Sequence, residues 1–391
     1  MAVSGSTFLK ACRRVLRGSS ARLARLSFLT AAWVVLDAVP VASAAQTIVQ
    51  DARGGVCTDC LKLADRVTIG GDSERDMVLV GRGLIPLAAG ELLHARSVGG
   101  MPIFSRSGRF LRAVGREGSG PVEFRNIQLI LQDPRGGVHV FDAGNARHTV
   151  LDASLRLVKE WPGVVGRITS GIFLPDGRLV VNGYIPTRER VGLPLHVLPT
   201  GGGDIIRSFG LAPGELFDAE EAWASWRELA LGQRGTVWAA RRNKYQIEEW
   251  SVDGQRLSVI ERRPEWFRPY QRRTALTLAT PPQPHLERIH VDVTNRLWVF
   301  LLVPDPRWTS SVEEQPPLPG IKPSLVPTHY SGLYDTIVEV IDLKTMTLVA
   351  SQRFPHYLWG FLDGERVYGD GGTQDGLSRY SVWRLDASAL R

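Results

Sequence analysis

Hydrophobic and polar positions alternate over short runs through most of the chain, and glycine, asparagine, aspartate or serine separates the runs. Runs of one similar pattern begin six segments, at residues 90–95, 137–142, 177–182, 235–240, 295–300 and 364–370. A hairpin pattern follows each of them, at residues 102–111, 149–158, 196–206, 249–257, 340–348 and 382–390. Alternation with a period of two between turn residues predicts β-strands joined in hairpins. We find no convincing helical periodicity after residue 44.

Six copies of one four-stranded unit predict an all-β fold, a six-bladed β-propeller of four-stranded antiparallel blades. The chain ends inside the sixth unit, so we expect an N-terminal strand, within 61–69 or 77–81, to complete the last blade and close the ring. Closure removes the exposed edges of the sheets. Because one blade cannot bury its own apolar faces, we expect a single cooperative domain at residues 58–391.

The first 44 residues have the order of a secretory signal. Lys10 and five arginines precede an apolar stretch at residues 26–36, and Ala42-Ser43-Ala44 follows it as a cleavage site. We therefore expect a signal peptide at 1–44 and an N-terminal tail at 45–57. A mature chain without a transmembrane segment would then be periplasmic or secreted. A twin-arginine leader and an uncleaved anchor remain alternatives.

Composition and charge narrow the range of functions. The chain has 391 residues, of which 43% are hydrophobic and 22% charged, as in ordinary globular proteins. Its formal net charge is +7, but the first 44 residues alone hold six basic residues and one acidic residue. The mature chain is therefore nearly neutral, which argues against binding to nucleic acid. We expect a monomer.

Cys57 and Cys60 are the only cysteines after the signal segment. A structural zinc site needs about four ligands, and no second cysteine pair is present. Haem attachment would need histidine at position 61, which is Leu61. In an oxidising compartment the pair predicts a small local disulfide. A redox or metal-binding role and free thiols remain alternatives.

One segment carries a more specific motif. Gly118-Ser-Gly-Pro-Val-Glu-Phe is followed by Gly137-Val-His-Val-Phe-Asp-Ala-Gly-Asn145-Ala-Arg147. This pattern resembles an NHL repeat, and residues 210–217 together with 237–247 form a weaker copy. The chain as a whole resembles exported bacterial six-bladed propellers of the NHL and TolB-like kind. The resemblance implies the fold but says little about activity, because such propellers include both binding proteins and enzymes.

A ligand site is expected where the chain leads into the inner strand of each blade, on the same face as the loops between second and third strands. Arginine and tryptophan there suit an anionic or sugar-like ligand or an extended peptide. The residues expected to contact the ligand are Arg125, Arg167, Trp226, Arg227, Arg288 and Trp359. Ion-paired or solvated arginines and core tryptophans are the alternative interpretation. A loop at about 303–336, with seven prolines, should fold over the same face.

The one cluster that suggests catalysis is His285, Glu287, His290 and Asp292. Histidine with carboxylates suits metal binding or acid–base chemistry. Strand alternation, however, places Glu287 and His290 on opposite faces, and only His290 and Asp292 share one. We see no complete metal-ligand set and no nucleophile-elbow motif.

The sequence therefore predicts a recognition or scaffold module rather than an enzyme. It would bind a peptide, a glycan or a partner protein at the channel-entrance face, without a cofactor. The alternative is a metal-assisted lyase or hydrolase with calcium or zinc in the central channel.

Overall fold

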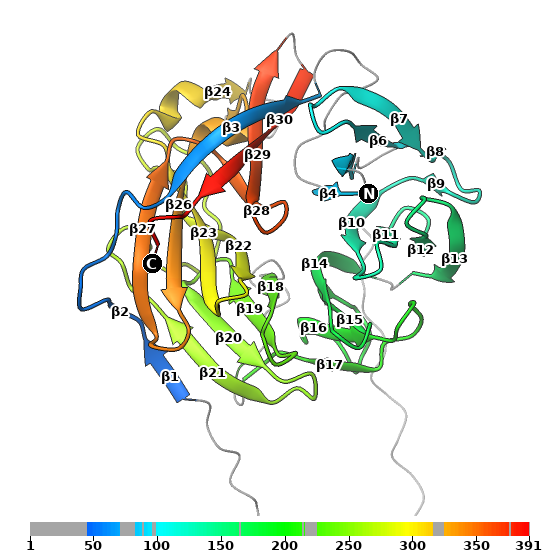
Figure 1. Ribbon diagram of the computed structural model, residues 1–391, viewed down its shortest axis with the longest axis horizontal. Helices are drawn as coiled ribbons and strands as arrows, with labels where there is room; N and C mark the ends of the chain where they lie inside the picture. The colour runs from blue at the N-terminus through cyan, green and yellow to red at the C-terminus, as the bar shows by residue number, and fades with distance from the viewer. Residues whose placement is uncertain are drawn as a thin grey trace, which may run out of the picture. The chain divides into compact units, whose positions relative to one another are not determined.

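The chain folds into a six-bladed β-propeller, as the sequence predicted (Figure 1). The computed structural model describes residues 45–70, 83–87, 90–95, 99–163, 166–212, 215, 225–315, 324–374 and 377–390. The expected signal segment at 1–44 lies outside these residues. The described part of the chain contains no helix long and apolar enough to cross a membrane.

The first three blades are four-stranded antiparallel sheets, each formed by consecutive strands. Blade 1 comprises β4 (Leu84–Pro86), β5 (Leu92–His94), β6 (Met101–Phe104) and β7 (Phe110–Val114). Blade 2 comprises β10 (Ile127–Gln132), β11 (Val138–Asp142), β12 (Arg147–Leu151) and β13 (Leu157–Pro162). Blade 3 comprises β14 (Arg167–Phe173), β15 (Leu179–Tyr184), β16 (Leu195–Leu198) and β17 (Arg207–Phe209). A short parallel pair, β8 (Arg116–Glu117) and β9 (Glu123–Phe124), joins blades 1 and 2.

The other three blades each include a strand from the N-terminal segment. Blade 4 comprises β18 (Arg227–Leu231), β19 (Val237–Arg241), β20 (Gln246–Trp250), β21 (Arg256–Glu261) and β1 (Ala45–Ile48). Blade 5 comprises β22 (His285–Val291), β23 (Arg296–Pro304), β26 (Tyr334–Asp342), β27 (Thr347–Phe354) and β2 (Gln50–Asp51). Blade 6 comprises β28 (Leu358–Phe361), β29 (Arg366–Gln374), β30 (Leu377–Asp386) and β3 (Lys62–Ile69).

The N-terminal segment runs along the rim of the ring. Residues 45–57, expected to be a tail, pair in parallel with the outer strands of two blades, through β1 on β21 and β2 on β27. Cys57 and Cys60 form a disulfide at the end of this segment. Strand β3 then pairs antiparallel with β30, so residues 62–69 close the ring as predicted. The other candidate for closure, 77–81, lies outside the described residues.

The core lies between neighbouring blades, because alternate side chains of each strand point toward the blade on either side. Between blades 4 and 5, for example, Ile247, Leu286, Val299 and Ile341 are fully buried in one cluster, and Val49 of the N-terminal segment joins them. The apolar side chains that alternate along the strands of the six units therefore pack between neighbouring blades, and not between two opposed sheets.

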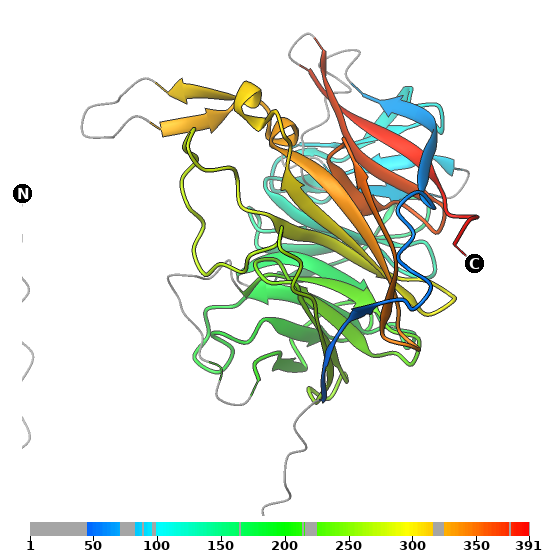
Figure 2. The same ribbon diagram turned by 90° about the vertical axis from the view of Figure 1, so that its left-hand side faces the viewer.

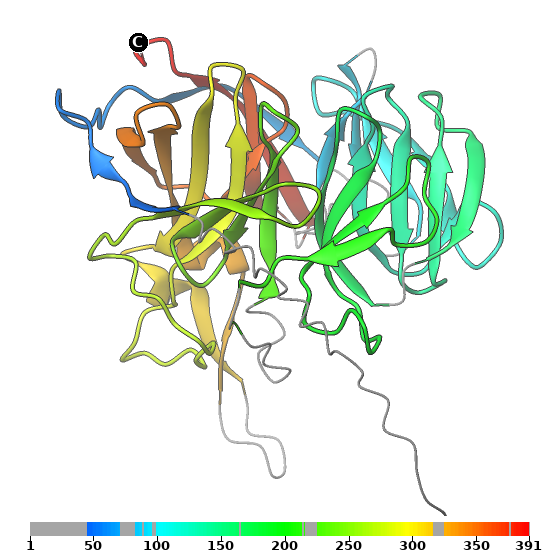
Figure 3. The same ribbon diagram turned by 90° about the horizontal axis from the view of Figure 1, so that it is seen from below.

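Two faces of the ring differ in how their chain connections are built. We call the face on which the inner strands β4, β10, β14, β18, β22 and β28 begin the loop face, and the opposite one the turn face. The connection from β23 to β26 lies on the loop face and contains the 3-10 helices η4 (Trp308–Ser311) and η5 (Tyr330–Leu333). Between them, β24 (Val312–Gln315) and β25 (Ser324–Pro327) form a hairpin that projects from the ring (Figures 2 and 3).

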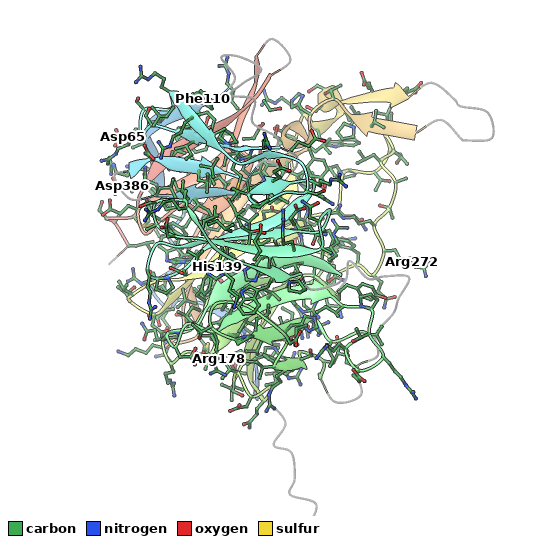
Figure 4. The ribbon with its side chains drawn as sticks, turned by 90° about the vertical axis from the view of Figure 1, so that its right-hand side faces the viewer. Asp65, Phe110, His139, Arg178, Arg272 and Asp386 are labelled. Atoms are coloured by element: carbon green, nitrogen blue, oxygen red, sulfur yellow. A yellow bond between two sulfur atoms is a disulfide. The ribbon has the colours of Figure 1, made fainter. Side chains whose placement is uncertain are left out.

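The turn face is made of short hairpin turns. Their first residue is repeatedly an aspartate whose carboxylate accepts backbone N–H groups two to four residues further on, at 2.7–3.1 Å. The aspartates of this kind are Asp133, Asp152, Asp176, Asp292, Asp342 and Asp363. Such bonds are the reason aspartate favours turns. In Figure 4, Asp386 lies on this side of the ring and Arg272 on the side of the hairpin.

Candidate functional site

A network of charged side chains lies on the loop face where blades 4, 5 and 6 meet. Arg242, in the connection from β19 to β20, donates from Nη1 to Glu228 at 3.2 Å and from Nη2 to Glu287. Arg288 completes the network, with Nη1 3.3 Å from Glu228 and Nε donating to the backbone carbonyl of Trp359 at 3.3 Å. Both carboxylates are buried and both guanidinium groups are half-buried. Two cations and two anions make the network neutral and bind the three blades together.

The two carboxylates of this network differ in proton affinity. Burial alone would raise the pKa of Glu287, but the charge of Arg242 and a hydrogen bond from His285 outweigh it and lower that pKa to about 2. Burial raises the pKa of Glu228, because the attraction of Arg288 and Arg242 does not fully offset desolvation. A carboxylate with a pKa near 2 is a weak base. Glu287 therefore acts as the ion-pair partner of Arg242 rather than as a proton acceptor.

His285 lies beside this network in its neutral form. Burial lowers its pKa to about 4, although the carboxylate of Glu287 lies 3.3 Å from Nε2 and partly opposes the shift. The imidazole packs edge-on against the ring of Tyr334, with centroids 5.1 Å apart. His285 and Glu287 thus lie together at the start of β22, as the sequence suggested for a catalytic cluster.

The other two members of that cluster lie at the far end of β22. His290 packs against the ring of Phe361 at 4.8 Å and, with Arg288, lines a cavity of about 340 Å³ in the central channel. Asp292 begins a turn, where its carboxylate accepts the backbone N–H groups of Thr294 and Arg296 and the indole N–H of Trp298. The four candidates are therefore two separate pairs, and Asp292 is occupied by its own turn.

No metal-ligand set forms at the channel in the part of the chain that the structure describes. The only described group of three histidine, cysteine or acidic ligand atoms within 4.8 Å of one another is Cys57, Asp59 and Cys60. The two sulfur atoms of that group are joined in the disulfide at the rim.

Two of the expected ligand contacts come together on the loop face. The exposed guanidinium of Arg167 lies 4.4 Å from the centroid of the half-buried Trp226 ring, and that of Arg242 lies 6.0 Å from it. The next residue, Arg227, is buried, and burial lowers its pKa to about 9. Its backbone N–H donates to Asn182, which fixes the start of β18 against blade 3. Arg167 and Trp226 can therefore meet a ligand, whereas Arg227 belongs to the interior.

The remaining candidates also divide between surface and core. Arg125 is exposed at the approach to β10, and Arg288 faces the channel as described above. Trp359 is buried, with its ring edge-on to Tyr380 at 4.8 Å, and offers its carbonyl oxygen rather than its ring to the network. Sequence alone does not separate these cases, because tryptophan and arginine serve both surfaces and cores.

The residues of the NHL-like motif have a structural role. The Asp142 carboxylate accepts the backbone N–H groups of Arg125, Asn126 and Gly144, and the side-chain amide of Asn145. Asn145 and Arg147 donate in turn to backbone carbonyls of residues 118–123. The motif thus ties the connection from β11 to β12 to the segment that leads into blade 2.

Sequence reasoning missed the centre of the network, Arg242, and a cluster of tyrosines beside it. The position of Arg242 could have been found, since it lies in blade 4 in the connection equivalent to Asp142–Arg147 of blade 2. The tyrosines come from three separate connections: Tyr270 precedes β22, Tyr330 and Tyr334 precede or begin β26, and Tyr357 precedes β28. Nothing local in the sequence marks them as neighbours.

Comparison with known proteins supports the fold alone. No protein-family model matches the chain, and no curated protein matches it. A protein of Bacteroides fragilis described as a putative exported protein superposes with a TM-score of 0.54 at 12% identity, covering 87% of this chain and 99% of that one. A member of the DUF4221 family from Bacteroides vulgatus superposes with a TM-score of 0.55 at 8% identity, covering 83% of this chain and 98% of that one. At such low identity the shared feature is the architecture.

Proposed function

We propose that the chain is an exported recognition propeller that binds a peptide, a glycan or a partner protein on its loop face. The observation that carries the proposal is the surface formed by Arg167 and Trp226 above the Arg242 network. Buried ion pairs hold this surface in place, so little conformational entropy is lost when a ligand binds. Aromatic faces with an arginine beside them suit sugars, anions and extended peptides.

Export is part of the same proposal. The signal-like segment at 1–44 ends where β1 begins, so cleavage before Ala45 would leave every strand of the ring intact. A disulfide such as Cys57–Cys60 persists in an oxidising compartment. We therefore place the mature chain in the periplasm or outside the cell. N-terminal sequencing of the chain purified from that compartment should begin at Ala45.

The binding proposal is tested by an array of defined oligosaccharides and of acidic, neutral and basic peptides. The chain, expressed with its own leader, should bind a restricted set of array members. The double variant Arg167→Ala/Trp226→Ala should lose that binding while its melting temperature stays within a few degrees of the wild type. Binding that survives the double variant would exclude this surface as the site.

One observation favours the alternative function, a metal-assisted lyase or hydrolase. His285 and Glu287 are in contact, and both have strongly shifted pKa values, as catalytic pairs often do. Elemental analysis of the purified chain, made without chelator, separates the two functions. Near-stoichiometric zinc or calcium would favour the enzyme, and His285 and Glu287 would be the first residues to replace.

A further inference from the structure

The hairpin of β24 and β25 is a two-stranded sheet of its own on the loop face. Within the described part of the chain it pairs with none of the six blades, and Figure 2 shows it extending away from them. Its base is fixed, because Trp308 and Leu333 are buried in one apolar cluster and Val312 packs against that cluster. The ring therefore sets the direction of the hairpin. A sheet of only two strands is marginally stable in water and gains from a third strand.

The hydrogen bonds of the hairpin show which of its backbone groups point outward. The N–H of Thr328 donates to the carbonyl of Ser311 at 3.0 Å, and the next pair along the ladder is Val312 with Pro327. Pro327 has no N–H, and bonded pairs alternate with non-bonded pairs in an antiparallel ladder. Val312 and Glu314 therefore belong to non-bonded pairs, so their N–H and C=O groups face the outer edge of β24.

The two edges of the hairpin differ in their capacity to pair. On β25 the outward groups belong to Leu325 and Pro327, and proline is a residue that blocks pairing at a sheet edge. On β24 both outward residues, Val312 and Glu314, have an N–H to donate. None of the residues that the structure describes accepts from these two N–H groups. The edge of β24 is therefore open to a further strand, whereas the edge of β25 is partly blocked.

The rim of the same molecule shows that short edges of this kind do accept strands. Strand β1 adds four residues in parallel to β21, and β2 adds two residues in parallel to β27. Val49, between these two added strands, packs into the core of blades 4 and 5. Strand β24 offers an edge of four residues, Val312–Gln315. Its length is therefore sufficient for the same kind of pairing.

The charge of β24 selects the strand that this edge can accept. Glu313 and Glu314 are exposed, and β24 and β25 contain no basic residue. Neither carboxylate is in an ion pair with a side chain that the structure describes. Antiparallel pairing of β24 with its own copy would place Glu313 or Glu314 opposite itself, and like charges in that position are destabilising. The edge therefore discourages pairing between two copies and favours a strand with basic residues.

We propose that the edge of β24 binds an extended segment of a partner protein with two consecutive basic residues, which joins the hairpin as a third strand. Consecutive side chains of a strand point to opposite faces, so one basic side chain meets Glu313 and the other meets Glu314. The outward N–H and C=O groups of Val312 and Glu314 bond the backbone of the added strand. The inference goes beyond the recognition function proposed above, because the hairpin does not include Arg167 or Trp226.

The first test is a titration of the full chain, purified after export, with the acetylated peptide Val-Thr-Lys-Arg-Thr-Val at low ionic strength. The matched controls have Gln-Gln or Glu-Glu in place of Lys-Arg. The basic peptide should bind about tenfold more tightly than the Gln-Gln peptide, and the Glu-Glu peptide should bind least, because two exposed charge pairs form or are reversed. No binding of the basic peptide, or equal binding of all three, overturns the proposal.

Methylation of the peptide backbone tests strand pairing without a change in the protein. One peptide carries N-methyl groups on its first, third and fifth residues, and another carries them on the second, fourth and sixth. Only one of these sets has N–H groups that face β24. That methylated peptide should lose at least about tenfold in affinity, whereas the other should stay within about threefold of the parent. Equal losses in the two peptides contradict strand addition.

Proline substitutions distinguish the two edges of the hairpin. Glu314→Pro removes an outward N–H and should abolish binding of the basic peptide, whereas Glu314→Gln, which keeps the N–H, should weaken binding only a few-fold. Leu325→Pro makes the matched change on the edge of β25 and should leave the affinity unchanged. A melting temperature near that of the wild type shows that each variant is folded. Equal effects of Glu314→Pro and Leu325→Pro contradict the proposal.

Failure of this inference is distinct from failure of the recognition function. A basic peptide that Glu314→Pro no longer binds, and that Arg167→Ala/Trp226→Ala still binds, is held at the hairpin as proposed. A peptide with the opposite dependence is held by Arg167 and Trp226. That result removes the inference about the hairpin and leaves the recognition function in place.

Discussion

The two faces of the propeller use the same residue types for different purposes. On the turn face, aspartates such as Asp133 and Asp292 bond the backbone of their own turns. On the loop face, the buried carboxylates Glu228 and Glu287 bond arginines that come from other connections and other blades. Charge on the turn face is therefore local, while charge on the loop face joins blades and supports an aromatic surface. Changes on the two faces should have different consequences.

The largest difference is expected on removing the central arginine. Arg242→Met leaves two buried carboxylates without their shared partner, so the free energy of unfolding should fall by about 3–5 kcal/mol. Arg178→Met is the matched change on the turn face, where the pair with Asp176 is partly exposed, and should cost less than about 1 kcal/mol. Urea denaturation measures both. Equal effects would show that the network is no more structural than a surface pair.

Lowering the pH should reduce the stability of the folded chain through protonation of His285 on the loop face. Its pKa is about 4 in the folded chain and about 6.5 when unfolded. As pH falls, the unfolded chain therefore takes up the proton on His285 before the folded chain does. The contribution of neutral His285 to the free energy of unfolding is complete above pH 6.5 and is lost as pH falls toward 4. Between pH 7 and 4.5, His285→Phe should lose roughly 2 kcal/mol less stability than the wild type. Parallel curves of stability against pH would contradict the buried neutral histidine.

A turn aspartate should matter for stability and not for binding. Asp292→Ala removes hydrogen bonds to the backbone of Thr294 and Arg296 and to the indole of Trp298, at a cost of about 2 kcal/mol. Affinity for any ligand of the loop face should stay within twofold. A large loss of affinity or of activity in this folded variant would restore Asp292 as a functional residue.

The smallest change in stability is expected at the exposed arginine of the loop face. Arg167→Ala removes a cation–π contact with Trp226 that is open to solvent, which is worth about 0.5–1 kcal/mol. Ligand affinity should nevertheless fall severalfold. The neighbouring substitution, Arg227→Ala, should lower stability more than Arg167→Ala does and leave ligand affinity nearly unchanged, because the Arg227 side chain is buried. Thermal melts and the same binding assay on both variants test this reversal.

The fold was predictable because it depends on repeated local patterns. Alternation and turn residues in six units indicated the blade count, and the incomplete last unit indicated a closing strand at 61–69 or 77–81. The structure shows that Lys62–Ile69 closes the ring. The candidate site was only partly predictable. Arg167 and Trp226 follow from their place before the inner strands, but Arg227 and Trp359 occupy similar places and are buried.

The difference between those residues arises from long-range packing. Whether a side chain at the start of an inner strand faces the ligand or the next blade depends on strand twist and on bulges, such as the one between Leu286 and Arg288. The tyrosine cluster likewise depends on how three distant connections fold over one face. Neither property has a signature within a few residues of sequence.

The claim that the loop face recognises a ligand, while the turn face is structural, is tested most directly by hydrogen–deuterium exchange. The exported chain would be measured with and without the best-binding member of the array. We predict protection at 166–169, 225–228 and 242–246, with the turns at 133–137, 152–156 and 292–296 unchanged. Protection confined to those turns or to the rim strands β1 and β2 would contradict the account.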